Sequence, residues 1–256
     1  MLMGMAVPIQ LWIAFPVTQA HQSRMNPIKS RRQSGASSIF SGGPRVVGIV
    51  DSPGAMRSAR RLKAGEVDFL EWRADCLGGQ IFDSPTPWIV TVRHPSEGGA
   101  NRLSVVQRRA LALEILPRAT ILDVEVRSMP QMLEVITAAR GAHVGILASF
   151  HNFQKTPTTA RLQETIQRAY DIGADAVKIA TVTESASDMA RLLALFERAP
   201  LPLAVMGMGR LGMASRIALA TAGSVLNYGW IDRPNVSGQW SVRELQSLLA
   251  KCVNLA

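Results

Sequence analysis

The sequence predicts a single-domain (β/α)₈ barrel, an α/β fold in which eight parallel strands alternate with helices around one core. Short apolar runs alternate with amphipathic segments from Val46 onward, an order typical of a parallel sheet covered by helices. Eight such units fill roughly 210 residues, the short end of the range for this fold. The chain has 256 residues and 47% hydrophobic content, enough for one large core.

Each predicted strand is an apolar run bounded by polar or glycine-rich turns. The predicted strands are 46–50, 69–75, 88–93, 121–126, 143–151, 175–180, 202–209 and 224–230. The segments between them have apolar residues at helical spacing. The predicted helices are 55–65, 104–116, 130–140, 159–173, 187–199, 213–223 and 241–253. Residues 76–87, CLGGQIFDSPTP, are too few for a full crossover helix, so we expect a shortened second βα unit.

The first 45 residues differ from the rest. Residues 1–20 are apolar, but Pro8 and Pro16 interrupt them as a membrane span, and they lack the basic start of a signal peptide. We favour an upstream start codon, with Met25 opening the product. The Ser-, Gly-, Arg- and Lys-rich stretch 26–44 is typical of a flexible leader. We therefore expect a leader over 1–45 and the barrel over 46–256.

The net charge of +9 is unevenly distributed. Five positive charges and no acidic residue precede Asp51, which leaves +4 on the remainder. The basic residues of the body are dispersed, a pattern of anion-binding enzymes rather than of nucleic-acid-binding proteins. Cys76 and Cys252 form neither a CxxC motif nor a zinc motif. We expect a cytoplasmic protein without a metal, a nucleic-acid partner or a membrane partner.

Lys178 interrupts the run GADAVKIAT, which otherwise has the pattern of a buried strand. It shares one face with Ala176 and Ala180, while Val177 and Ile179 occupy the other. A buried ammonium needs a partner, a path to water, or loss of its proton. An arginine would serve an inert ion pair at least as well, whereas an amine that attacks a carbonyl must be a lysine.

We therefore predict Schiff-base chemistry at Lys178. Burial and nearby cations such as Arg73 or Arg93 would favour its uncharged form. His151, on the neighbouring strand, is the predicted proton shuttle because imidazole titrates near neutrality. Glu97 could orient the histidine ring. A structural ammonium is the competing interpretation of the lysine.

Several predicted strands end in polar residues, where active sites of this fold lie. Any one of these residues could belong to a salt-bridge layer, and a lone histidine could be structural. Their joint occurrence on six or more strands favours a site, because buried charges are unfavourable unless they are paired or used. The candidates are Glu71, Arg73, Asp75, Arg93, Glu97, Asp123, Glu125, His151, Lys178, Arg216 and Gln239.

The run Gly207-Met208-Gly209-Arg210-Leu211-Gly212 matches the dinucleotide fingerprint G-x-G-x-x-G. A fingerprint of this kind normally lies after the first strand of its domain, whereas this run follows the seventh predicted strand. We instead expect the glycines to let the backbone approach an anion near a helix start, with Arg216 supplying a charged fork.

Taken together, EWRAD, TVRHPSEGG, LDVEV, SFHNF, DAVKIA, MGMGRLGMASR and SGQWSVREL resemble, in order, the motifs of type I 3-dehydroquinate dehydratase. The resemblance extends from about Val46 to the C-terminus. It implies a (β/α)₈ barrel, commonly a homodimer, that acts on a small molecule in the shikimate pathway to aromatic compounds. It also implies a lyase that needs neither a metal nor an organic cofactor.

By this resemblance, Lys178 forms an imine with the substrate ketone, His151 is the general acid/base, and Glu97 is its paired carboxylate. Arg216 would bind the substrate carboxylate. The other positions that match substrate-contacting residues are Glu71, Arg73, Arg93, Gln239, Met206, Met208, Tyr228 and Asn235, the last standing where a serine is usual. The implied reaction is the syn dehydration of 3-dehydroquinate to 3-dehydroshikimate.

Two alternatives remain at this point. A class I aldolase would use the same lysine to cleave a C–C bond. A non-catalytic barrel could bind a polyol acid, or its basic leader could contact an acidic partner. Two further departures from the family pattern are Ser237 in place of a common proline and Gly207 in place of a frequent serine.

Overall fold

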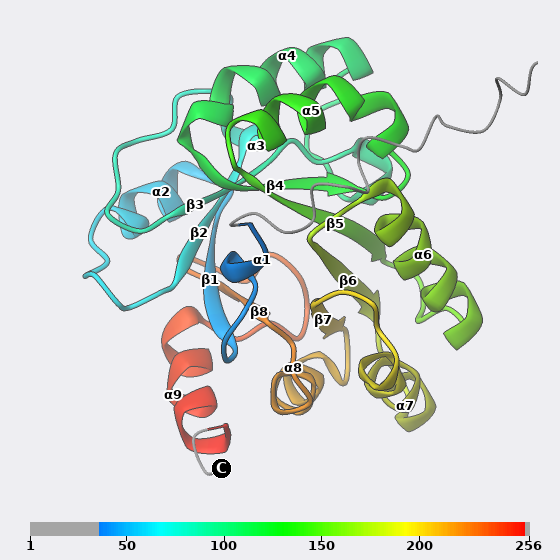
Figure 1. The fold of residues 1–256 in the computed structure, drawn as a ribbon. Helices are drawn as coiled ribbons and strands as arrows, with labels where there is room; N and C mark the ends of the chain where they lie inside the picture. Colours follow the sequence, from blue (N-terminus) through cyan, green and yellow to red (C-terminus); the bar gives the residue numbers. More distant parts are fainter. Residues whose placement is uncertain (1–35, 254–256) are drawn as a thin grey trace, which may run out of the picture.

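The computed structural model describes residues 36–253, which form an eight-stranded parallel barrel surrounded by helices (Figure 1). All eight predicted strands are present, so the predicted fold class is confirmed. Their bounds are β1 Arg45–Val50, β2 Phe69–Arg73, β3 Trp88–Thr91, β4 Ala119–Glu125, β5 Gly145–Asn152, β6 Ala176–Val182, β7 Leu203–Met208 and β8 Leu226–Trp230.

The strands follow one another around the barrel in the order β7-β6-β5-β4-β3-β2-β1-β8. Among the described residues no ladder joins β7 to β8. There, Val225 N donates to Leu203 O at 2.8 Å. The Ser224 hydroxyl accepts from Val205 N at 2.9 Å. This join nearly closes the barrel with fewer main-chain hydrogen bonds than its neighbours.

Helices cover the outside of the barrel (Figure 1). Serine and threonine caps begin most of them, because their side-chain oxygens accept from free N–H groups of the first turn. No helix within residues 36–253 is long and apolar enough to cross a bilayer. The α-helices are α1 Ala36–Ile39, α2 Pro53–Ala59, α3 Ala74–Leu77, α4 Val105–Ile115, α5 Leu133–Gly141, α6 Thr159–Ile172, α7 Ala186–Leu193, α8 Gly212–Thr221 and α9 Val242–Cys252.

The second βα unit is short, as predicted, because α3 makes a single turn. An aromatic cluster lies beside it. The rings of Trp72, Phe82 and Trp88 pack edge to face, with centroids 5.0 to 6.1 Å apart. The cluster provides apolar packing next to the shortened crossover.

Two apolar layers hold the barrel together. The outer layer, between strands and helices, includes Val177 and Ile179. The inner layer fills the barrel and includes Ala176 and Ala180, on either side of Lys178. The predicted division of faces along β6 is therefore confirmed.

Phe40 packs into the inner layer and is 2% exposed. A Cβ on Gly145, at the start of β5, would lie 3.2 Å from the Phe40 ring. Figure 1 shows α1 over the middle of the barrel. Sequence analysis assigned these residues to the leader and began the barrel at Val46. The described structure extends before that boundary, because the Phe40 side chain packs over this mouth of the barrel. Residues 1–35 of that leader lie outside the described residues.

Candidate active site

A cavity of about 490 Å³ opens at the carboxyl ends of the strands. Its lining comes from strands and loops far apart in the sequence, as the fold requires. Every residue predicted to act on or bind the substrate lines it: Glu71, Arg73, Arg93, Glu97, His151, Lys178, Met206, Met208, Arg216, Tyr228, Asn235 and Gln239. Sequence analysis did not identify Asp51 and Phe153, which also line it, because neither residue type is distinctive in a loop.

Lys178 extends from β6 into the floor of the cavity and is 4% exposed. Its ammonium donates to Glu71 Oε1 and to Asp123 Oδ2, both at 3.1 Å. It also lies 4.1 Å from the centre of the Tyr228 ring. The sequence led us to expect cations around this amine, whereas its nearest charged groups are two carboxylates. The lysine is thus held by ion pairs to both carboxylates.

Arg93 lies at the centre of a buried ionic network. Its guanidinium donates twice to Asp123, at 2.9 Å each, and to Glu125 at 3.1 Å. It also donates to the Ser149 hydroxyl at 2.6 Å. Although burial acts in the opposite direction, the charges of Arg93 and Lys178 hold the pKa of Asp123 far below its usual range.

Arg108 extends this network to the outside of the barrel. It comes from α4, is 1% exposed, and donates to Glu125 Oε2 at 2.6 Å and to Val92 O at 2.8 Å. Sequence analysis missed it, because the adjacent Arg109 has the same residue type and is partly exposed. No sequence signal separates the two arginines.

His151 and Glu97 form a hydrogen-bonded pair, and His151 lies further toward the carboxyl end of its strand than the residue that pairs with Lys178. Glu97 Oε2 lies 3.0 Å from His151 N and 3.1 Å from His151 Nδ1. When Glu97 is ionised its carboxylate accepts from Nδ1–H, which leaves Nε2 as the basic nitrogen. Burial, with Arg93 and Lys178 nearby, holds the pKa of His151 well below its usual range. The imidazole is therefore neutral at neutral pH.

Glu97 sits in the short 3₁₀ turn Pro95–Glu97 and is 5% exposed. Burial, followed by the charge of Glu125, raises the pKa of Glu97 to about 7. Its ionisation therefore changes within the physiological range, and with it the strength of its contact to the imidazole.

Arg73 is fixed by Asp75, which accepts two hydrogen bonds from its guanidinium at 2.8 and 2.9 Å. This bidentate contact fixes the orientation of the Arg73 guanidinium. Cys76 lies beside them in the cavity lining. Burial raises the pKa of its thiol to about 12, so the thiol stays protonated.

Arg216 lies in α8, directly after the glycine-rich turn at residues 207–212, and lines the cavity. It donates to Tyr228 O at 2.7 Å and to Gly238 O at 3.2 Å. Burial lowers its pKa to about 10, so the guanidinium remains charged at neutral pH and can bind an anion.

The glycines of the turn allow close packing within the protein. A Cβ on Gly207 would lie 2.3 Å from Ser215 Oγ, and one on Gly212 would lie 2.8 Å from Gly238 O. Gly209 has a φ of +77°, which favours glycine. The close approach that we expected toward an anion is thus made toward neighbouring protein segments.

Asn235 connects two loops at the cavity mouth. Its side-chain amide donates to Asp51, and its backbone N–H donates to Gln239 Oε1 at 3.0 Å. Its side-chain oxygen is buried without a hydrogen bond to any described residue. A ligand hydroxyl would satisfy that acceptor.

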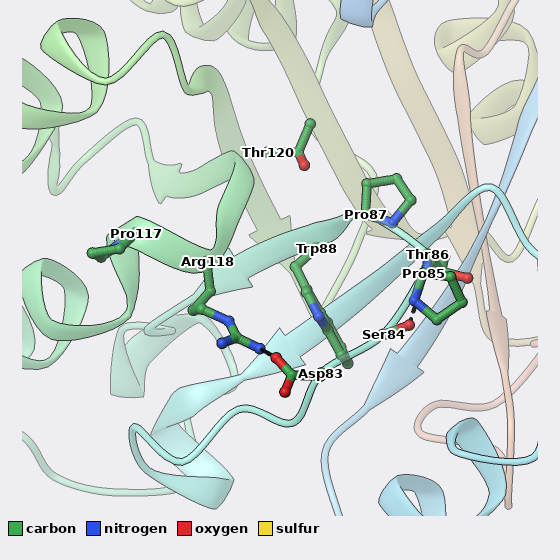
Figure 2. Close-up of a pocket in the computed structure, with 9 residues that line it drawn as sticks. All are labelled: Asp83, Ser84, Pro85, Thr86, Pro87, Trp88, Pro117, Arg118 and Thr120. Carbon is green, nitrogen blue, oxygen red and sulfur yellow. Dashed lines mark hydrogen bonds and ion pairs between the residues drawn. The ribbon is translucent and has the colours of Figure 1, made fainter.

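A second hollow, of about 500 Å³, lies near the amino ends of β3 and β4. Figure 2 shows its lining, in which Arg118 pairs with Asp83. Three prolines, Pro85, Pro87 and Pro117, form much of the rest. It has no histidine, lysine or buried acid in its lining, so the first cavity is the candidate active site. Within residues 36–253 no cluster of His, Cys, Asp or Glu could hold a metal ion.

The fold and the cavity define the class of β/α-barrel enzymes with a charged site for a small polar substrate at the carboxyl ends of the strands. The family model described as Type I 3-dehydroquinase matches residues 49–253. The chain therefore belongs to the type I 3-dehydroquinase family.

Individual relatives agree with this assignment. The chain is 31% identical over 210 residues to the 3-dehydroquinate dehydratase of Methanocella arvoryzae, a match that covers 79% of this chain and 94% of the relative. It is 32% identical over 211 residues to that of Thermococcus gammatolerans, covering 80% and 97%. A solved type I 3-dehydroquinate dehydratase from Clostridium difficile, covalently modified by comenic acid, has a TM-score of 0.73 and 26% identity over 85% of this chain and 95% of that one.

Proposed function

We propose that the protein dehydrates 3-dehydroquinate to 3-dehydroshikimate through an imine on Lys178. The observation that supports this most directly is a primary amine and a neutral imidazole on neighbouring strands, both lining one cavity. Membership of the type I 3-dehydroquinase family supports the choice of substrate.

In this mechanism, Lys178 Nζ attacks the ketone carbon and a water molecule leaves, which gives an imine. The imine acidifies the adjacent carbon, and His151 Nε2 removes a proton there. The same nitrogen then donates that proton to the departing hydroxyl on the same face of the ring, so a second water leaves. Hydrolysis of the imine releases the product and restores the lysine.

The cavity offers matching contacts for the rest of the substrate. Arg216 supplies a charged fork for its carboxylate. Glu71, Arg73 and Gln239 would hold its hydroxyls, while Met206 and Met208 would pack against its ring. Arg93 acts mainly by holding Asp123 and Glu125 in place.

The test is borohydride trapping. Borohydride added with 3-dehydroquinate should reduce the imine to a stable adduct, and mass spectrometry of peptides should locate it on Lys178. Lys178→Arg should abolish the adduct and lower turnover by about 10⁴-fold or more. Lys155→Arg is the matched control, because Lys155 is exposed after β5 and should keep wild-type activity. Near wild-type turnover by Lys178→Arg would rule out imine catalysis.

The same assay separates the alternatives. Formation of 3-dehydroshikimate gives a conjugated enone with ultraviolet absorbance. Turnover of a sugar phosphate without that absorbance would favour the aldolase. Ligand-induced stabilisation without any turnover would favour a binding protein.

We further propose a homodimer and a cytoplasmic location. Val106 in α4 and Leu133 in α5 are 65% and 44% exposed, and an Arg109–Glu134 ion pair joins the same two helices. Exposed apolar side chains on two helices that also carry charged groups suit a contact between copies. Sedimentation should give twice the monomer mass, and Val106→Asp should give the monomer. Cell fractionation would check the compartment.

A further inference from the structure

Imine formation requires an acceptor for one proton of the Lys178 ammonium, since only the neutral amine is nucleophilic. His151, the predicted proton shuttle, is not hydrogen-bonded to Nζ. Among the described residues, Nζ donates to Glu71 and to Asp123. A group in direct contact with Nζ is the best placed to take that proton.

Two carboxylates contact Nζ, and their surroundings differ. Asp123 is held by Arg93 through both oxygens and accepts a further hydrogen bond from Ser149 Oγ at 2.6 Å. These donors all stabilise the carboxylate form of Asp123, so it remains an anchor for the ammonium.

Glu71 has fewer partners. Its Oε1 accepts from Thr91 Oγ1 at 3.0 Å and from Lys178 Nζ at 3.1 Å, and its nearest Arg93 nitrogen is 3.8 Å away. Its Oε2 makes no hydrogen bond to any described residue, and Glu71 lines the cavity. A carboxylate with one oxygen on the amine and the other unengaged can both take a proton and present it to a ligand.

We propose that Glu71 is the acid–base residue of imine formation, relaying a proton between Lys178 Nζ and the substrate oxygen. This proposal rests on the imine mechanism proposed above. Glu71 takes one proton from the ammonium, and the neutral amine adds to the ketone carbon. A second nitrogen proton moves to the former carbonyl oxygen, which gives a carbinolamine. Glu71 then returns its proton to that hydroxyl, water leaves, and the protonated imine remains. The carboxylate is restored, so the step needs no other reactant.

The test measures the rate of imine formation in a single turnover, by quenching with borohydride at saturating 3-dehydroquinate. Saturation removes the effect of any lost affinity. Glu71→Gln keeps an oxygen that can accept from Thr91 and Lys178 but is not basic. At pH 7 its imine formation should be about 10²-fold slower than in the wild type. The rate should then rise about tenfold per pH unit, as hydroxide replaces the missing base.

Two variants sharpen the result. Glu71→Asp retains a carboxylate and should keep the wild-type pH profile at a reduced rate, and unfolding midpoints would confirm that both variants fold. Asp51→Asn removes a carboxylate that also lines the cavity but contacts Asn235 instead of the lysine. It should leave the pH profile of imine formation unchanged.

Three outcomes contradict the relay. A Glu71→Gln variant with raised KM but an unchanged saturated rate would make Glu71 a binding residue alone. A rate that stays low at every pH would mean that the missing function is not proton acceptance. A change of pH profile in Asp51→Asn like that in Glu71→Gln would indicate a general charge effect. Absence of an adduct in the wild type would instead overturn the imine mechanism itself.

Discussion

Individual side chains in the cavity are tuned by charges that come from other strands. Glu97 is the clearest case. Burial and the charge of Glu125 raise its pKa to about 7 in the folded protein, whereas in the unfolded chain its carboxyl has the usual pKa of a glutamate. Between the two pKa values the folded state binds more protons than the unfolded state. The free energy of unfolding therefore falls as pH rises through this window.

Replacing Glu97 by Gln should remove that pH dependence. Relative to the wild type, the variant should gain on the order of 3 kcal/mol in free energy of unfolding between pH 4 and pH 8. Urea unfolding of both proteins at the two pH values measures the difference. A difference that does not change with pH would mean that Glu97 titrates normally in the folded protein.

At this scale the sequence predicted residue types and faces better than partners. Alternation along one strand placed Lys178 inside the barrel, and the structure confirms that position. The carboxylates that hold it were not predicted, because Glu71 and Asp123 reach it from strands whose spacing around the barrel depends on register. The alternation of residues along one strand predicts which face of the sheet a side chain lies on. Its contacts depend on the pairing register with the neighbouring strands.

Among the elements, α4 has a polar attachment to the barrel. Arg108 anchors it to Glu125 and to the end of β3, whereas its neighbour Arg109 is 35% exposed and pairs at 3.6 Å with the exposed Glu134. The sequence predicted this helix from its apolar spacing but could not tell which arginine turns inward.

Arg108→Met should destabilise the protein by about 3–5 kcal/mol, because it leaves the buried Glu125 with one fewer cation. Arg109→Met should change stability by at most about 1 kcal/mol, as expected for an exposed pair. Urea unfolding of the two variants provides the comparison. Equal effects would show that the buried position of Arg108 contributes nothing.

At the scale of the whole molecule, the two mouths of the barrel differ in the side chains that fill them. The carboxyl mouth holds the charged cavity, and Phe40 packs into the inner layer at the opposite mouth. The order of strands and the shortened second unit followed from sequence. The place of Phe40 did not, since a lone apolar pair in a Ser- and Gly-rich stretch has no helical or strand periodicity.

Phe40→Ala should lower the free energy of unfolding by about 3 kcal/mol, because it empties a packed position in the core. Turnover at 25 °C should stay at the wild-type level, since the residue does not line the cavity. Met213→Ala, at a 39% exposed position outside the cavity lining, is the control for a change in apolar surface alone. Unchanged stability of Phe40→Ala would mean that α1 adds nothing to the core.

Because fewer main-chain hydrogen bonds join β7 to β8, we expect the barrel to open more easily between these two strands than between any other pair. Amide protons that flank this join should exchange with solvent through a smaller local opening than those inside the other seven strand pairings. Among the eight strand junctions, we therefore expect the earliest deuterium uptake at Val225. Met206 and Met208 stand on one side of this join and Tyr228 on the other. A small separation of these two strands would widen the cavity without breaking the pairing of the other strands.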